Sequence, residues 1–77
     1  MDLKSLVEYI AKNLVDNPDQ VTVQALESSS AITIELHVSP DDMGRVIGKS
    51  GRIANSIRTL VRVAAMRQGK RATLEIV

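Results

Sequence analysis

Residues 45–52 read Arg45-Val46-Ile47-Gly48-Lys49-Ser50-Gly51-Arg52, an apolar pair followed by two glycines that enclose a lysine and a serine. Glycine allows the backbone to approach a ligand closely, because no Cβ intervenes. The N–H groups that open a helix lack intrahelical partners and attract phosphate. Lys49 adds a positive charge within the loop, and an arginine lies on either side of it. The stretch therefore predicts a phosphate-binding loop.

A nucleotide-hydrolysing P-loop is the main alternative, because Gly48-Lys49-Ser50 looks like the end of a Walker A motif. That motif needs four residues between its first glycine and the Gly-Lys pair. Only three residues separate Gly44 from Gly48. The loop is also expected to follow a capped helix, where a P-loop follows a strand. We therefore reject the P-loop.

Both sides of the loop are predicted to be helical. Ser39-Pro40-Asp41-Asp42 is typical of a helix start, because serine caps, proline suits the first position and acids favour the positive helix end. We read the two aspartates as helix-start electrostatics and not as a metal site. This short helix should end near Ile47, before Gly48. A longer helix is expected over about 51–68 and should end at Gly69. Its predicted core stripe is Ile53, Ile57, Leu60, Val61 and Ala64.

The rest of the chain predicts one more helix and three strands. Apolar residues at helical spacing indicate a helix over about 2–15, with the stripe Leu3, Leu6, Val7, Ile10 and Leu14. Strict alternation predicts a hairpin, with strands over about 20–27 and 31–39 around a turn at 28–30, and a last strand through Ala72, Leu74 and Ile76. The fold class is therefore α+β, in the order α-β-β-α-α-β. We expect a three-stranded sheet with three helices packed on one face, in a single domain over residues 1–77.

Composition narrows the function. Residues 1–44 hold two basic and eight acidic side chains, whereas residues 45–77 hold eight basic and one acidic, which suits a polyanion on one side. The chain has no cysteine and a single histidine, His37, so we expect no metal, cofactor or catalytic centre. With neither a signal peptide nor a membrane-length apolar run, a cytoplasmic location is expected. Tyr9 is the one aromatic residue, which disfavours binding modes that stack bases on aromatic side chains.

Val46-Ile47-Gly48-Lys49-Ser50-Gly51 resembles the IGxxG signature of KH domains, and the element order is similar to the bacterial type II arrangement. The whole chain resembles the stand-alone bacterial KH proteins of the KhpA family. The resemblance implies binding of about four nucleotides of single-stranded RNA, with the loop on the sugar-phosphate backbone and the bases in a groove between the two helices and an adjacent strand. The implied RNA-binding residues are Arg45, Ile47, Gly48, Lys49, Ser50, Gly51, Arg52 and Asn55.

The resemblance also implies a role as a post-transcriptional regulator or RNA chaperone. It implies a homodimer, or a heterodimer with a larger KH-containing, Jag-like (KhpB) protein. A half-apolar stripe on the long helix offers a surface for such pairing: Asn55, Thr59, Val63 and Met66. A KH fold that serves only protein pairing is the remaining alternative. Because such a degenerate domain should lose Lys49 or gain acids in the loop, RNA binding is favoured. An enzyme is rejected, since no nucleophile–base pair is present.

Overall fold

The computed structural model describes residues 2–77. Its helices are α1 (Leu3–Leu14), α2 (Met43–Ile47) and α3 (Arg52–Arg67), and its strands are β1 (Thr22–Glu27), β2 (Ala31–His37) and β3 (Arg71–Ile76). Three 3₁₀ turns, Pro18–Gln20, Pro40–Asp42 and Lys49–Gly51, join them. The predicted α+β class and the order α-β-β-α-α-β are confirmed, with element ends displaced by one or two residues.

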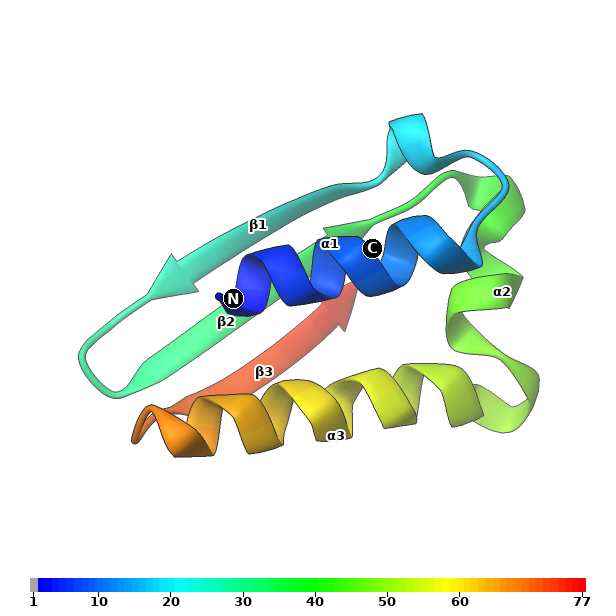
Figure 1. The fold of residues 1–77 in the computed structure, drawn as a ribbon. Coiled ribbons are helices and arrows are strands. Elements are labelled where there is room, and N and C mark those ends of the chain that lie inside the picture. Colours follow the sequence, from blue (N-terminus) through cyan, green and yellow to red (C-terminus); the bar gives the residue numbers. More distant parts are fainter. Residues whose placement is uncertain (1) are drawn as a thin grey trace.

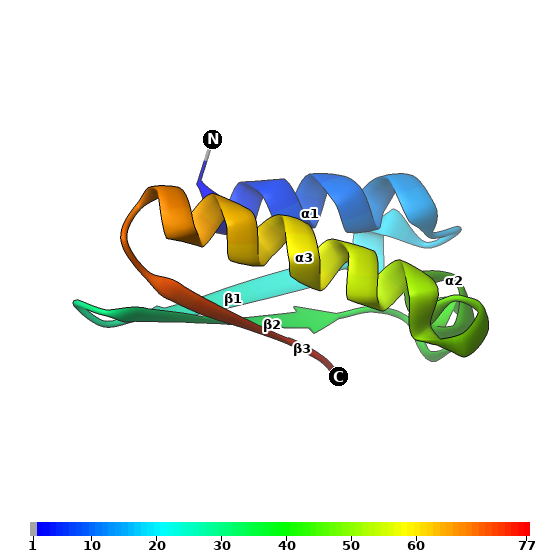
Figure 2. The same ribbon diagram turned by 90° about the horizontal axis from the view of Figure 1, so that it is seen from below.

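The sheet has the strand order β1-β2-β3. The hairpin pairs β1 with β2 antiparallel, whereas β3 runs parallel to β2. A parallel pair needs a long crossover, and α2 and α3 supply it. Helices α1 and α3 lie side by side over one face of the sheet, and α2 lies at its end against both of them (Figures 1 and 2). The loop between α2 and α3 is thereby held at one end of the molecule.

One apolar core lies between the two long helices and the sheet. Its fully buried members include Val7 of α1, Ile34 and Leu36 of β2, Val46 of α2 and Val61 of α3. In α3 the buried face consists of Ala54, Ile57, Val61 and Ala65. The placement of Leu60 in the core was wrong: its side chain is 53% exposed. The reason is helix phase, because Leu60 lies about 100° round the helix from Val61, which takes the central core position.

Asp42 has a structural role that the sequence pattern did not predict. It stands at the N-cap of α2, yet its side chain does not cap that helix. The carboxylate is buried, with 1% of the residue exposed. It accepts hydrogen bonds from the backbone N–H groups of Asp16 and Asn17, both at 3.1 Å, and from Nδ2 of Asn17 at 3.0 Å. Asp42 therefore ties the segment after α1 to the start of α2, in addition to any effect on the helix dipole.

Burial alone would raise the pKa of the Asp42 carboxyl. The hydrogen bonds from Asp16 and Asn17, helped by the positive charge of Arg45, outweigh that effect and hold the pKa below its ordinary value. The ionised carboxylate is thus the form that the fold stabilises.

The charge asymmetry of the sequence becomes an asymmetry in space. The basic second half supplies α3, which carries four arginines and no acid and lies on the β3 side of the sheet (Figure 1). The acids of the first half lie mostly in the turns outside the helices and strands, at Asp16, Asp19, Asp41 and Asp42. On the face of the sheet away from the helices, Glu35 and Glu75 are register partners, and His37 lies 3.9 Å from Glu35. The open face of the sheet is therefore unsuited to a polyanion.

Candidate nucleic-acid interface

The loop after α2 is a compact turn. Gly48 has φ 76° and ψ 174°, after which Lys49–Gly51 form a 3₁₀ turn that leads directly into α3. Ser50 and Gly51 also have positive φ, at 57° and 75°. The N–H of Gly51 donates to the carbonyl of Gly48 at 3.2 Å. This backbone is uncommon outside glycine, and it exposes both Lys49 and Ser50 at the tip.

Position 48 requires glycine for steric reasons as well as for its positive φ. A Cβ at this position would lie 2.6 Å from Cγ1 and 2.9 Å from Cδ1 of Ile53 in the first turn of α3. No real Cβ tolerates such contacts. At Gly51 the nearest atom, Nδ2 of Asn55, would be 3.9 Å away. The first glycine therefore seats the loop against α3, whereas the second is favoured only by its φ.

The start of α3 presents positive charge, and the N–H of its first residue, Arg52, donates to the carbonyl of Lys49. No side chain caps this helix end, and its first turn contains no acidic residue. Lys49 and Arg52 are both exposed. The four ion pairs found within residues 2–77 involve neither of them. An anion at this end meets backbone N–H groups, the positive end of the helix dipole and two available cations.

Arg45 is placed differently from the other predicted residues. Its Nη2 lies 3.3 Å from Oδ2 of Asp16, which follows α1. Both side chains are largely exposed, and such surface pairs contribute about 0–1 kcal/mol. The side chain of Arg45 therefore lies beside the end of α1 and not at the tip of the loop. Its ion pair with Asp16 is weak enough for Arg45 to exchange Asp16 for another anion.

Beside the loop, Ile47 and Asn55 lie at the surface, as expected. Ile47 ends α2 and is 38% exposed, so it offers apolar surface near the glycines. Asn55 stands one turn into α3, where its Oδ1 accepts from Nη1 of Arg58 at 3.2 Å. The Nε of Arg58 in turn donates to the backbone carbonyl of Leu74 in β3, at 3.4 Å. Arg58 thus bridges α3 and the strand.

Arg58 was missed by the sequence-based selection. Its position three residues after Asn55 places both on one helix face, and that spacing was the available signal. The contact with β3 could not be inferred from sequence, because nothing in the pattern indicates which edge of the sheet lies beside this face of α3.

The free edge of β3 lies beside α3. The N–H of Arg71 donates to Ser30 at 3.0 Å, and that of Val77 donates to Leu36 at 2.9 Å. In a parallel ladder alternate residues face the partner strand, so the backbone groups of Ala72, Leu74 and Ile76 point outward. Hydrogen-bonding groups of the main chain therefore lie on the β3 side of this surface, and polar side chains of α3 lie on the other side.

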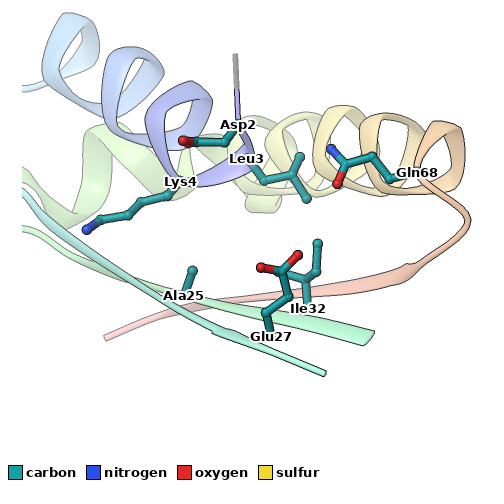
Figure 3. A pocket seen from close by; sticks show the side chains of 7 residues that line it. All are labelled: Asp2, Leu3, Lys4, Ala25, Glu27, Ile32 and Gln68. Atoms are coloured by element: carbon teal, nitrogen blue, oxygen red, sulfur yellow. The ribbon is translucent and has the colours of Figure 1, made fainter. Parts of the chain in front are cut away.

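A separate hollow of about 230 Å³ lies between the start of α1, β1 and the end of α3 (Figure 3). Its two acidic side chains already have partners, and its other polar residues are Lys4 and Gln68. Asp2 caps α1 through the N–H of Ser5 at 2.7 Å, and Glu27 pairs with Lys70 at 2.6 Å. Because two carboxylates line it, this hollow repels phosphate. The groove between α3 and β3 is the better site for an anionic ligand.

Comparison with known proteins decides the family. The model of the KH domain of KhpA and KhpB matches residues 4–76. The chain belongs to this KhpA/KhpB KH-domain family. The relatives include the RNA-binding protein KhpA of Caldanaerobacter subterraneus subsp. tengcongensis, 57% identical over 94% of this chain and 96% of that protein. KhpA of Clostridium acetobutylicum is 51% identical over 97% of this chain and the whole of that protein.

Solved structures support the fold independently. The GTP-analogue complex of Era with nucleotides 1506–1542 of 16S ribosomal RNA is similar with a TM-score of 0.69 at 21% identity, over 96% of this chain and 28% of Era. Era of Aquifex aeolicus bound to GDP and aluminium fluoride gives a TM-score of 0.68. At this identity the likeness concerns the fold alone. The chain corresponds to a little over a quarter of each Era chain.

The family confirms the prediction that this chain is not an enzyme, because its named members are RNA-binding proteins built on a non-enzymatic fold. Within residues 2–77, no helix combines the length and apolar character needed to cross a bilayer. Over the same residues, His, Cys, Asp and Glu side chains nowhere gather in a group of three that could hold a metal ion.

Proposed function

We propose that this protein binds single-stranded RNA over about four nucleotides, with the Gly48–Gly51 loop on the sugar-phosphate backbone. The observation that carries the proposal is the loop geometry. Two glycines with positive φ expose Lys49 and Ser50 immediately before an uncapped helix end that contains no acid in its first turn. Backbone donors, the helix dipole and Lys49 then act together on the phosphates. The family membership and the names of the relatives support the same ligand.

The bases lie along the groove between α3 and β3. Tyr9 is on α1, away from this groove, so the bases are held without an aromatic platform. Ile47 supplies apolar contact. Asn55, Arg58 and the outward backbone groups of β3 supply hydrogen bonds to the base edges. These contacts favour unpaired bases, because the hydrogen-bonding edges of a paired base are already occupied by its partner base.

The Lys49→Asp, Ser50→Asp double variant tests the loop. Both residues are exposed, and aspartate tolerates the left-handed φ of Ser50 better than most residues, so the circular dichroism spectrum should remain native. Affinity for a short single-stranded oligonucleotide should fall at least tenfold, because two acids repel phosphate. Unchanged affinity in a natively folded variant would show that the loop is not the site.

We further propose that the protein acts as a dimer, with itself or with a larger Jag-like (KhpB) partner, as a cytoplasmic post-transcriptional regulator or RNA chaperone. The family model covers both KhpA and KhpB. Leu60, Val63 and Met66 are exposed along α3, which gives the helix an apolar outer surface. Because one groove holds few nucleotides, two linked grooves raise affinity through avidity. Crosslinking of the protein to cellular RNA followed by sequencing identifies the transcripts, and failure to recover any would argue against the regulatory role.

A further inference from the structure

A hollow of about 350 Å³ lies between the last turns of α3 and the start of β3. It is at the end of α3 opposite the Gly48–Gly51 loop. Three of the residues that line it are basic, and no acidic residue is among them. The lining consists of Arg62, Met66, Lys70, Arg71, Ala72 and Thr73. We refer to it as the distal pocket.

Two of its cations are available to a ligand. Lys70 is bound to Glu27 at 2.6 Å. In contrast, Arg62 and Arg71 take part in none of the ion pairs or side-chain hydrogen bonds found within residues 2–77. Both arginines are exposed. A guanidinium group binds a phosphate through two parallel hydrogen bonds, so each arginine can hold one phosphate oxygen pair.

The apolar part of the pocket suits a base. Met66 is 70% exposed, and Ala72 lies across from it on β3. A thioether makes favourable contacts with aromatic rings, and Thr73 adds a hydroxyl group at the side. A nucleotide site needs cations for the phosphate and an apolar surface for the base. The distal pocket has both.

The distal pocket continues the groove that starts at the loop. Asn55, Arg58, Arg62 and Met66 follow each other at intervals of three or four residues, so they share one face of α3. Arg58 connects that face to β3 midway. From Gly51 to Met66 the helix rises about 22 Å. The distal pocket therefore lies at the far end of the surface that a strand starting at the loop would follow.

We propose that the distal pocket is a second RNA subsite, which takes a nucleotide of the same strand beyond the four that the loop and groove hold. The proposal rests on the RNA binding proposed above. Arg62 and Arg71 bind the phosphate, and the base lies against Met66 and Ala72. The binding footprint is therefore longer than a single four-nucleotide groove.

The experiment compares a tetranucleotide and an octanucleotide pool, both single-stranded RNA of mixed sequence, by heteronuclear NMR titration of the full chain. The octanucleotide should bind at least tenfold more tightly. Arg62→Glu with Arg71→Glu should weaken octanucleotide binding about tenfold, because two phosphate contacts are lost and reversed in sign. Tetranucleotide binding should change less than twofold. Arg62→Glu alone, with Arg67→Glu as its matched control, separates position from charge, since each variant reverses one positive charge on α3 and Arg67 lies outside the pocket.

The subsite proposal fails if both lengths bind with equal affinity after correction for the number of binding registers. It also fails if the double variant loses the same affinity for both lengths, or if Arg67→Glu weakens octanucleotide binding as much as the variant in the pocket does. Circular dichroism verifies that each variant is folded. The Lys49→Asp, Ser50→Asp variant separates this proposal from the proposed function, because it should weaken binding of both lengths. If that loop variant binds both pools normally, the proposed function itself fails, whatever the distal pocket does.

Discussion

Gly48 and Ile53 are in direct contact across the junction of α2 and α3. The side chain of Ile53 occupies the space where any residue other than glycine would place its Cβ, 2.6 Å from Cγ1. The loop is therefore seated on an apolar side chain of the helix that follows it. Because the chain makes this contact within itself, the packing of Ile53 holds the loop backbone in its positive-φ conformation, and binding needs little ordering of the chain.

Gly48→Ala should consequently destabilise the protein more than Gly51→Ala. The first variant forces Cβ into Ile53 and should lower the free energy of unfolding by about 2–4 kcal/mol, from overpacking together with an unfavourable φ. The second meets open space and should cost only the φ term, about 1–2 kcal/mol. Urea unfolding followed by circular dichroism measures both. Equal losses would contradict the steric role assigned to Ile53.

Arg58 should contribute more to base recognition than to the stability of the fold, because its one hydrogen bond to β3 is long, at 3.4 Å. Its guanidinium reaches Asn55 and the carbonyl of Leu74 from a partly exposed position. Arg58→Ala should lower affinity for single-stranded RNA by about 1–3 kcal/mol and reduce the preference among bases, while the unfolding midpoint changes little. Arg58→Lys should keep part of the affinity but lose base preference, because an ammonium group lacks the planar fork. If both variants retain the wild-type base preference in competition binding, Arg58 does not read bases.

Asp42 should make stability depend on pH in acid. Its folded pKa is below the ordinary value, so its stabilising contribution is fully present above the unfolded pKa, about 3.9. That contribution is lost as the pH falls through the lower folded value. Asp42→Asn should lower the thermal unfolding midpoint at pH 7 and flatten its fall in acid. Asp41→Asn, exposed and next in the chain, is the control and should behave like wild type. Equal behaviour of the two variants would remove the anchoring role of Asp42.

Self-association should depend on the outer surface of α3. Leu60→Glu with Val63→Glu introduces charge where two helices would meet, and neither residue lines the distal pocket. Light scattering across concentrations should show a wild-type dimer that becomes a monomer in the variant. A wild-type mass of 8.4 kDa at high micromolar concentration would exclude a homodimer. A dimer that persists in the variant would place the interface on another surface.

The local pattern of the sequence was enough for the elements and the loop, but not for what depends on their packing. The alternation of Ile32, Ile34 and Leu36 with polar residues involves only neighbouring positions, and so does the spacing of the two loop glycines. For that reason the strand and the position of the loop were predicted correctly. The phase of α3 depends on which of its faces packs on the sheet, and a difference of one residue turned Leu60 outward. The anchoring by Asp42 joins residues 25 and 26 positions apart, a separation that periodicity does not address.

The concentration of basic side chains on α3 also affects how the protein meets its ligand. Helix α3 carries four arginines and no acidic residue, so one side of the molecule is strongly basic and the protein carries a permanent electric dipole. In the field of a polyanion such a dipole rotates before contact, so that the basic side arrives first and the acidic face of the sheet is turned away. A larger share of encounters with RNA is then productive than if the protein approached in random orientations. The association rate falls as added salt shortens the range of the field.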